Sequence, residues 1–236
     1  MTHSGGGYLP NMEFNFNPIL LIWFPVFLFS LTLHEFAHAL SAKWGGDMTA
    51  TYKGRLTLNP IPHIDPVGTI ALPLIAGLTG LPLFGWAKPV PVNELRLRHS
   101  RWTVFVSLAG PLSNILLVVV SAILLKVLFA AGVLQGVEGL DVGNWRGALF
   151  TALTLFIFTN ILLALFNLMP IPPLDGSHVV HYYLVRRNPS MWRFWEFLQR
   201  FGMIVLWLLI FVSPLGRYLF AAVQGTAGAI LYWVNT

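Results

Sequence analysis

The segment His34-Glu35-Phe36-Ala37-His38 sets two histidines four residues apart, with a glutamate beside the first. On a helix, positions i and i+4 lie on one face, so both imidazoles can reach a single zinc ion. Glu35 can then take a proton from a water molecule bound to that ion. The alternative is a buried helix with interior polar residues. Because ionisable groups in an apolar helix are costly unless they are paired or bound to a metal, the spacing predicts a metal site.

A catalytic zinc site needs a third protein ligand, because water takes the fourth position. The chain has no cysteine, which leaves the carboxylates and five other histidines: His3, His63, His99, His178 and His181. Asp175 is favoured, because the predicted topology returns the chain there to the membrane side that holds His38. The prolines in Pro170–Pro173 would end the preceding helix and hold Asp175 in a fixed loop. The alternatives are an N-cap role for Asp175 and a structural role for His178 near the site.

The composition places these residues in a membrane. Apolar residues account for 56% of the 236 residues and charged residues for 10%, against about 25% charged in a typical soluble domain. A soluble chain of this size needs more charge to cover its surface. The predicted fold class is therefore an all-α polytopic membrane protein, with about five transmembrane helices plus one re-entrant or broken segment.

The predicted spans are the long apolar stretches of the chain: Ile19–Ala42, Trp102–Leu134, Gly147–Met169, Phe201–Val212 and Tyr218–Val234. The stretch Val67–Phe84 is also apolar, but its glycines and prolines argue against a plain spanning helix. We therefore expect Val67–Phe84 to be the re-entrant or broken segment.

The net charge of +5 comes from short basic clusters between apolar runs, which indicates membrane topology and not a nucleic-acid-binding surface. Three clusters belong on the cytoplasmic side: Lys43–Arg55, Lys88–Arg101 and Arg186–Arg200. They share that side only if Val67–Phe84 enters and leaves the membrane on one face. The N-terminus and the loop around Asp141 are then external.

These motifs together resemble the site-2 protease family (peptidase family M50) of zinc intramembrane metalloproteases, in the short form without a PDZ or CBS domain. Five stretches carry the resemblance: Leu33–Ala39, Asn59–Thr69, Gly85–Asn93, Ala109–Asn114 and Asn167–Gly176. Many zinc enzymes share the H-E-x-x-H motif alone. Its combination with the N-x-x-P-x-P-x-L-D-G turn, in this order and in a membrane chain, is highly specific.

By this resemblance, Glu35 is the catalytic carboxylate. The implied ligands of one Zn²⁺ per chain are His34, His38 and Asp175. The implied substrates are single membrane-spanning helices, cut within or near the bilayer. Asn114 and Asn167 match family positions near the site, where each either polarises the substrate carbonyl or satisfies backbone groups; hydrogen bonding between helices is the alternative.

The predicted organisation has three parts. Residues 1–17 form a flexible N-terminal tail, 18–187 the membrane-embedded metalloprotease core, and 188–236 the C-terminal transmembrane helices. The tail is not expected to be a cleavable signal peptide, because it is polar and glycine-rich and has no basic start.

The sequence therefore predicts a zinc-dependent intramembrane endopeptidase that cleaves transmembrane segments of membrane-protein substrates. Its predicted place is the cell membrane of a prokaryote, with the active site toward the cytoplasm. Its partners are the lipid bilayer and those substrates, with no nucleic acid, and no pattern sets the oligomeric state. The broken segment Val67–Phe84 and the loop to Asn93 could offer an extended edge for an unwound substrate strand. The alternatives are a membrane zinc carrier and a catalytically inactive metal-binding scaffold.

Overall fold

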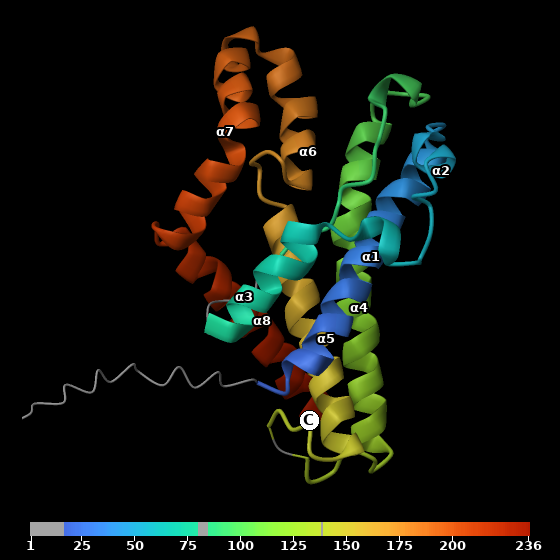
Figure 1. Cartoon of the computed structure of the whole chain (residues 1–236), viewed down its shortest axis with the longest axis vertical. Helices are drawn as coiled ribbons and strands as arrows, with labels where there is room; N and C mark the ends of the chain where they lie inside the picture. Colours follow the sequence, from blue (N-terminus) through green and yellow to red (C-terminus); the bar gives the residue numbers. More distant parts are fainter. Residues whose placement is uncertain (1–16, 80–84, 138) are drawn as a thin grey trace, which may run out of the picture.

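The computed structural model describes residues 17–79, 85–137 and 139–236, and every regular element in that part of the chain is helical. The predicted all-α class is therefore confirmed. The long helices are α1 (Leu20–Trp44), α4 (Trp102–Ala130), α5 (Trp145–Asn167), α7 (Trp192–Phe211) and α8 (Leu215–Asn235) (Figure 1). Shorter α-helices are α2 (Thr49–Tyr52), α3 (Leu72–Thr79) and α6 (Asp175–Tyr183). The tail predicted over 1–17 lies, except for Asn17, outside the described residues.

Helices α1, α4 and α5 form the central bundle, in which α4 runs antiparallel to its two neighbours (Figure 1). Helix α8 packs against α4 and α5. Between α4, α5 and α8 lies an apolar core whose fully buried members include Leu125, Ile157 and Ala227. In lipid, such helices are held by van der Waals packing and interhelical hydrogen bonds, because the surrounding tails are as apolar as the core.

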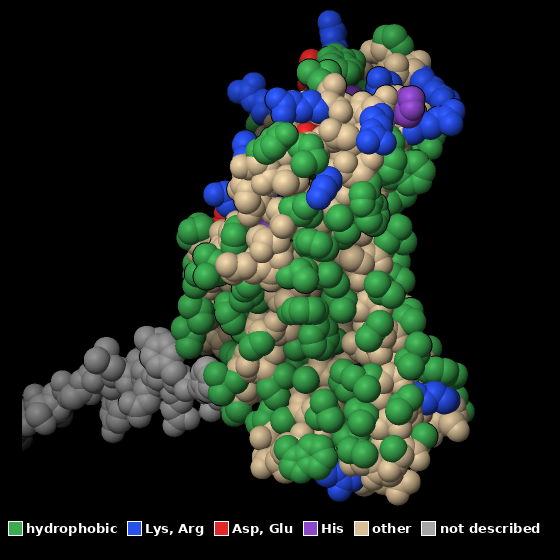
Figure 2. Space-filling model, turned by 90° about the vertical axis from the view of Figure 1, so that its right-hand side faces the viewer, with side chains coloured by type: hydrophobic (Ala, Val, Ile, Leu, Met, Phe, Trp, Pro, Cys, Tyr) green, Lys and Arg blue, Asp and Glu red, His purple; other side chains and the backbone are tan. Residues whose placement is uncertain are grey.

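Four helical stretches of the described chain are long and apolar enough to cross a membrane: Ile19–Trp44, Trp102–Ala130, Trp145–Asn167 and Pro189–Phe211. Helix α8 is 21 residues long but less apolar. It corresponds to the predicted span Tyr218–Val234. Figure 2 shows hydrophobic side chains over the middle of the molecule and Lys and Arg gathered mainly at its upper end. This distribution supports a polytopic membrane protein.

The segment predicted to be re-entrant or broken, Val67–Phe84, is described over residues 67–79, and this part is not one regular helix. It begins with a π-helix over Pro66–Ala71 (η2) and continues as α3. The chain then comes back to its own start, because the Trp86 N–H donates to the carbonyl of Gly68 at 3.2 Å. A Cβ at Gly68 would lie 2.4 Å from the Trp86 ring, so only glycine allows this approach. The return of the chain is the geometry that a re-entrant segment requires.

Helix α7 is longer than the predicted apolar stretch Phe201–Val212. It begins at Trp192 and so reaches 20 residues. Its first turns carry Arg193, Glu196 and Arg200, all exposed, among aromatic residues. Because charged and aromatic residues are mixed there, the hydropathy pattern alone does not show where the helix begins.

Candidate metal centre

The two histidines of the H-E-x-x-H motif lie one turn apart on the buried face of α1. His34 is 4% exposed and His38 is 8% exposed. Their Nε2 atoms are 3.1 Å apart. The i, i+4 spacing therefore brings both imidazoles to one point, as the sequence predicts.

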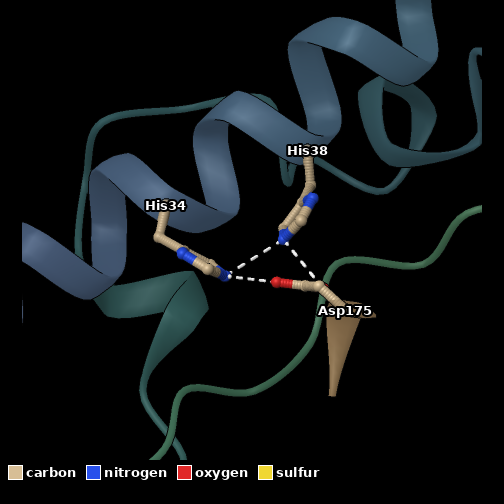
Figure 3. A group of neighbouring side chains, drawn as sticks. All are labelled: His34, His38 and Asp175. Atoms are coloured by element: carbon tan, nitrogen blue, oxygen red, sulfur yellow. Dashed lines mark hydrogen bonds and ion pairs between the residues drawn. The ribbon is translucent and has the colours of Figure 1, made fainter. Parts of the chain in front are cut away.

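Asp175 reaches the same point from α6 (Figure 3). Its Oδ2 atom lies 3.1 Å from His34 Nε2, and its Oδ1 atom lies 3.3 Å from His38 Nε2. Asp175 is the first residue of α6, its carboxylate faces the two imidazoles, and no side chain caps that helix, so the N-cap role considered for Asp175 is wrong. A Cβ at Gly176 would lie 2.2 Å from the Leu168 carbonyl oxygen, so the Asp-Gly pair lets the turn close tightly on the end of α5.

The hydrogen bonds of the rings determine which nitrogens face the cluster. His38 Nδ1 lies 2.7 Å from the carbonyl oxygen of Val106, which can only accept, so Nδ1 carries the hydrogen. His34 Nδ1 lies 2.7 Å from Asn114 Oδ1, another acceptor. In their neutral forms, both rings therefore present Nε2 lone pairs to each other and to the carboxylate of Asp175. Three electron-rich atoms this close repel one another unless a cation lies among them.

Space for that cation exists because α4 carries a glycine at this point. A Cβ added at Gly110 would lie 2.4 Å from His38 Nε2 and 2.6 Å from His34 Nε2. Ligand atoms about 2.1 Å from a tetrahedral zinc ion lie about 3.4 Å from one another. The observed separations of 3.1–3.3 Å are close to that value. The donor set, two imidazoles and one carboxylate, is also that of known catalytic zinc sites, so these residues fit a zinc ion.

Glu35 lines a cavity of about 540 Å³, and the group of His34, His38 and Asp175 lines the same cavity. The carboxylate is nearly buried, at 8% exposed. Its Oε2 atom accepts a hydrogen bond of 2.7 Å from the backbone N–H of Val90. A carboxylate fixed beside a metal cluster in this way is placed to act as a general base.

The N–H that binds Glu35 belongs to an extended stretch over residues 85–93, here called the 85–93 segment, which lines the cavity. Two buried side chains from earlier in the chain hold it in place. The Arg55 guanidinium donates to the carbonyl oxygen of Lys88 at 2.5 Å, and Asp47 Oδ2 accepts from the Asn93 N–H at 2.6 Å. Neither residue could be assigned to the site from sequence, because an isolated charge in a basic loop carries no spacing signal.

Two of the other candidate histidines lie away from the cluster. The His63 ring is buried, and its Nε2 atom bonds the carbonyl oxygen of Thr57 at 3.0 Å. His99 is exposed in its basic loop. His3 lies outside the described residues.

His178 and His181 lie on α6, beyond Asp175. His178 lines the cavity, and its Nδ1 atom lies 3.7 Å from Glu94 Oε1. The neighbouring His178 imidazole holds the pKa of the Glu94 carboxyl below its usual range. The His181 ring stacks on Trp195 with 5.5 Å between ring centroids. Among the described residues, neither ring belongs to the group of three that could hold a metal, and the structural role considered for His178 stays a prediction.

The two asparagines singled out by their positions have different surroundings. Asn114 is fully buried and bonds His34, so it orients an imidazole of the cluster and joins α4 to α1. Asn167 lines the cavity and donates to the carbonyl of Leu163 at 2.9 Å, one turn earlier on α5. A third amide, Asn160, is fully buried beside Asn114 and was not assigned a role from sequence.

Two buried histidines of a helix that can span a membrane, an aspartate that meets them and an adjacent glutamate are the residue set of a membrane metallopeptidase. The comparisons agree. The chain matches the family model described as "Peptidase family M50" over residues 78–209, which include Asp175. The chain belongs to this family, which confirms the predicted class of enzyme.

Curated relatives cover most of this chain. "Putative zinc metalloprotease YwhC" of Bacillus subtilis (strain 168) is 40% identical over 190 residues, 80% of this chain and 79% of its own. "Putative zinc metalloprotease Rip2" of Mycolicibacterium smegmatis is 30% identical over 83% of this chain and 69% of its own. The protein of the same name in Mycobacterium tuberculosis (strain H37Rv) is 31% identical over 88% and 70%. No solved structure matches the chain significantly.

Proposed function

We propose that the protein is a zinc-dependent intramembrane endopeptidase with Glu35 as its catalytic carboxylate. The proposed zinc ligands are His34 Nε2, His38 Nε2 and the carboxylate of Asp175. One observation carries the proposal: these ligand atoms converge, with separations of 3.1–3.3 Å, on the wall of the cavity that Glu35 also lines. The names of the bacterial relatives, which describe zinc metalloproteases, support the choice of metal.

Zinc bound at this site would polarise a scissile carbonyl and make water nucleophilic at neutral pH. Glu35 takes the proton of the attacking water and passes it to the leaving amine. The Val90 N–H, which donates to Glu35 Oε2, holds the carboxylate in place for both transfers. Asn114 and Val106 hold the two imidazoles with their Nε2 atoms toward the cavity.

The substrates in this proposal are membrane-spanning helices that unwind locally. An intact helix cannot present its peptide bond, because its carbonyl groups are already hydrogen-bonded. The walls of the cavity include Leu31 of α1, Leu163 of α5 and Leu206 of α7, three helices that can span a membrane, so we expect the cavity to reach membrane depth. Such walls suit an apolar substrate segment.

The 85–93 segment provides only part of the extended edge expected from sequence. The N–H groups of Trp86, Lys88 and Val90 already donate to Gly68, His63 and Glu35 respectively. These alternate residues occupy one edge of the extended chain. On the other edge, Pro89 and Pro91 have no N–H. We therefore expect the segment to position Glu35 more than to pair with a substrate strand along its length.

The arrangement favours a peptidase over a zinc carrier. A carrier needs polar groups along a path through both leaflets. Apart from the cluster and Glu35, the charged residues of α1, α4 and α5 are Lys43, Lys126 and Arg146, all near helix ends. Simple carriage also gives no role to the carboxylate of Glu35.

The first test separates metal binding from chemistry by the substitution Glu35→Gln. Glutamine keeps the shape of the side chain but cannot accept the proton of water. We expect one zinc ion per chain, measured by elemental analysis, to remain. Cleavage of a membrane-helix substrate should fall by at least about 10²–10⁴-fold.

Asp175→Ala should behave differently, because it removes the only anionic ligand. We expect zinc affinity and cleavage to fall together, as they should in His34→Ala. His99→Ala is the matched control, because that exposed ring lies away from the cluster and should leave both properties unchanged. Full zinc occupancy in Asp175→Ala would show that Asp175 is not the third ligand.

A further inference from the structure

Three buried polar side chains join the three helices of the central bundle behind His34. Asn160 of α5 donates through Nδ2 to Ser30 Oγ of α1 at 2.9 Å and to the carbonyl of Phe156 at 2.8 Å. Asn160 Oδ1 accepts from Asn114 Nδ2 at 2.7 Å. Asn160, Asn114 and Ser30 are all 0% exposed. In an apolar bundle, groups this deeply buried are costly unless every one of them is satisfied.

The orientation of the Asn160 amide follows from two backbone carbonyls. The carbonyl of Phe156 can only accept, so the amide must turn its NH₂ group that way. Ser30 leads to the same orientation, because its hydroxyl hydrogen is donated to the Val26 carbonyl at 2.8 Å and its oxygen is left to accept. A flipped Asn160 would set its oxygen against two acceptors.

The orientation of Asn160 determines that of Asn114. Because Asn160 presents its oxygen, Asn114 must turn its NH₂ group toward α5 and its oxygen toward His34. His34 Nδ1 must then carry the hydrogen, which in the neutral ring leaves the lone pair on Nε2. With Asn114 alone this assignment would be ambiguous, since the nitrogen and oxygen of an amide are distinguished only by their partners.

We infer that Asn160 is a positioning residue that sets the tautomer of His34 through Asn114. Only the side chain of Asn114 lies between Asn160 and His34, so Asn160 touches neither the proposed metal nor the substrate. Without it, Asn114 can rotate and present its NH₂ group to Nδ1, which moves the ring hydrogen to Nε2 and removes one lone pair from the metal site. The inference rests on the proposed function for the identity of the metal, but the tautomer exists without the metal.

The experiment compares Asn160→Leu, Asn160→Asp and the control Thr154→Val with the wild type. Leucine removes both the NH₂ group, which donates, and the carbonyl oxygen, which accepts. A buried, protonated aspartic acid keeps both, because its hydroxyl can donate to Phe156 and its carbonyl can accept from Asn114. Thr154 lies on the same helix, is buried and has no hydrogen-bond partner for its Oγ1 atom, so valine tests the loss of a polar atom alone.

Two measurements follow. In metal-free protein labelled with ¹⁵N-histidine, the His34 nitrogens, assigned by their loss in His34→Ala, should show Nδ1–H in the wild type and a mixture with Nε2–H in Asn160→Leu. Zinc affinity, measured by competition with a chelator, should fall about 10–100-fold in Asn160→Leu. Asn160→Asp should recover most of that loss, and Thr154→Val should match the wild type.

An unchanged His34 tautomer together with wild-type zinc affinity in Asn160→Leu would overturn the inference. Should Asn160→Leu fail to fold, a loss of affinity in Asn160→Asp equal to the loss in Asn114→Leu would overturn it as well. A wild-type protein that binds no zinc would overturn the proposed function instead. The tautomer measurement would still decide the role of Asn160, so the two failures are distinguishable.

Discussion

At the scale of single residues, the proposed metal site depends on a glycine as much as on its three ligands. Gly110 leaves open the space between the two imidazole Nε2 atoms. We expect Gly110→Ala to abolish stoichiometric zinc binding, because the added methyl group would occupy the position that the cation needs. Zinc content by elemental analysis and helix content by circular dichroism together measure this effect.

Gly225→Ala on α8 is the control for that substitution. A Cβ at Gly225 would meet nothing within 4 Å, so the variant should bind zinc as the wild type does. Its helix should be slightly stabilised, since alanine has the higher helix propensity. A Gly110→Ala protein that folds and binds one zinc ion with wild-type affinity would contradict the proposed position of the metal.

The residues that carry chemistry were predictable where spacing or chain order reveals them. The i, i+4 pattern identifies His34 and His38, and the return of the chain to the same membrane side identifies Asp175. Gly110 and Asn160 could not be assigned roles in this way, because one glycine or one asparagine in an apolar stretch has many ordinary uses. Their roles arise only when α1, α4 and α5 pack together.

At the scale of elements, the 85–93 segment links the buried Arg55 side chain to the carboxylate of Glu35. Arg55 donates to the carbonyl oxygens of Lys88 and Pro89, and the N–H of the next residue, Val90, donates to Glu35. The peptide unit between Pro89 and Val90 thus lies between a guanidinium and a carboxylate. Its position depends on both.

We expect Arg55→Gln to lower the cleavage rate about tenfold or more while leaving zinc content unchanged. Hydrogen bonds to charged groups contribute about 1.5–3 kcal/mol, and losing these would release the Val90 N–H from Glu35. Hydrogen–deuterium exchange in the peptide containing Val90 should become faster. Lys53→Gln, an exposed neighbour, is the control, and equal effects in both variants would rule out a specific anchor at Arg55.

The elements differ in how well their sequences predict them. Long apolar stretches identify α1, α4 and α5 to within a few residues, because lipid requires a continuous helical backbone. The apolar stretch Phe201–Val212 does not by itself set the start of α7, because the first turns of that helix mix arginines with aromatic residues. The path of the 85–93 segment was beyond sequence reasoning as well, since an irregular backbone takes its shape from partners that are distant in the chain, such as Arg55 and Asp47.

At the scale of the whole molecule, the charge distribution orients the protein. Lys and Arg gather mainly at one end, and α1, α4 and α5 connect that end with the other (Figures 1 and 2). Three basic clusters that are distant in sequence lie at this end, where Lys and Arg gather. They can share it only because the chain returns to Gly68 after the helical stretch Pro66–Thr79. By the positive-inside rule, we expect this end to lie in the cytoplasm.

Single cysteines can test this orientation directly, because the chain contains none of its own. We expect cysteines at the exposed positions Lys53, Arg98 and Arg187 to react with a membrane-impermeant maleimide only after the cytoplasmic face is opened. A cysteine at exposed Gln135, in the loop after α4, should react in intact cells. Reaction at Arg98 but not at Lys53 in intact cells would mean that the chain between them crosses the membrane. Such a crossing would exclude the re-entrant arrangement and place the 85–93 segment on the face opposite the first basic cluster.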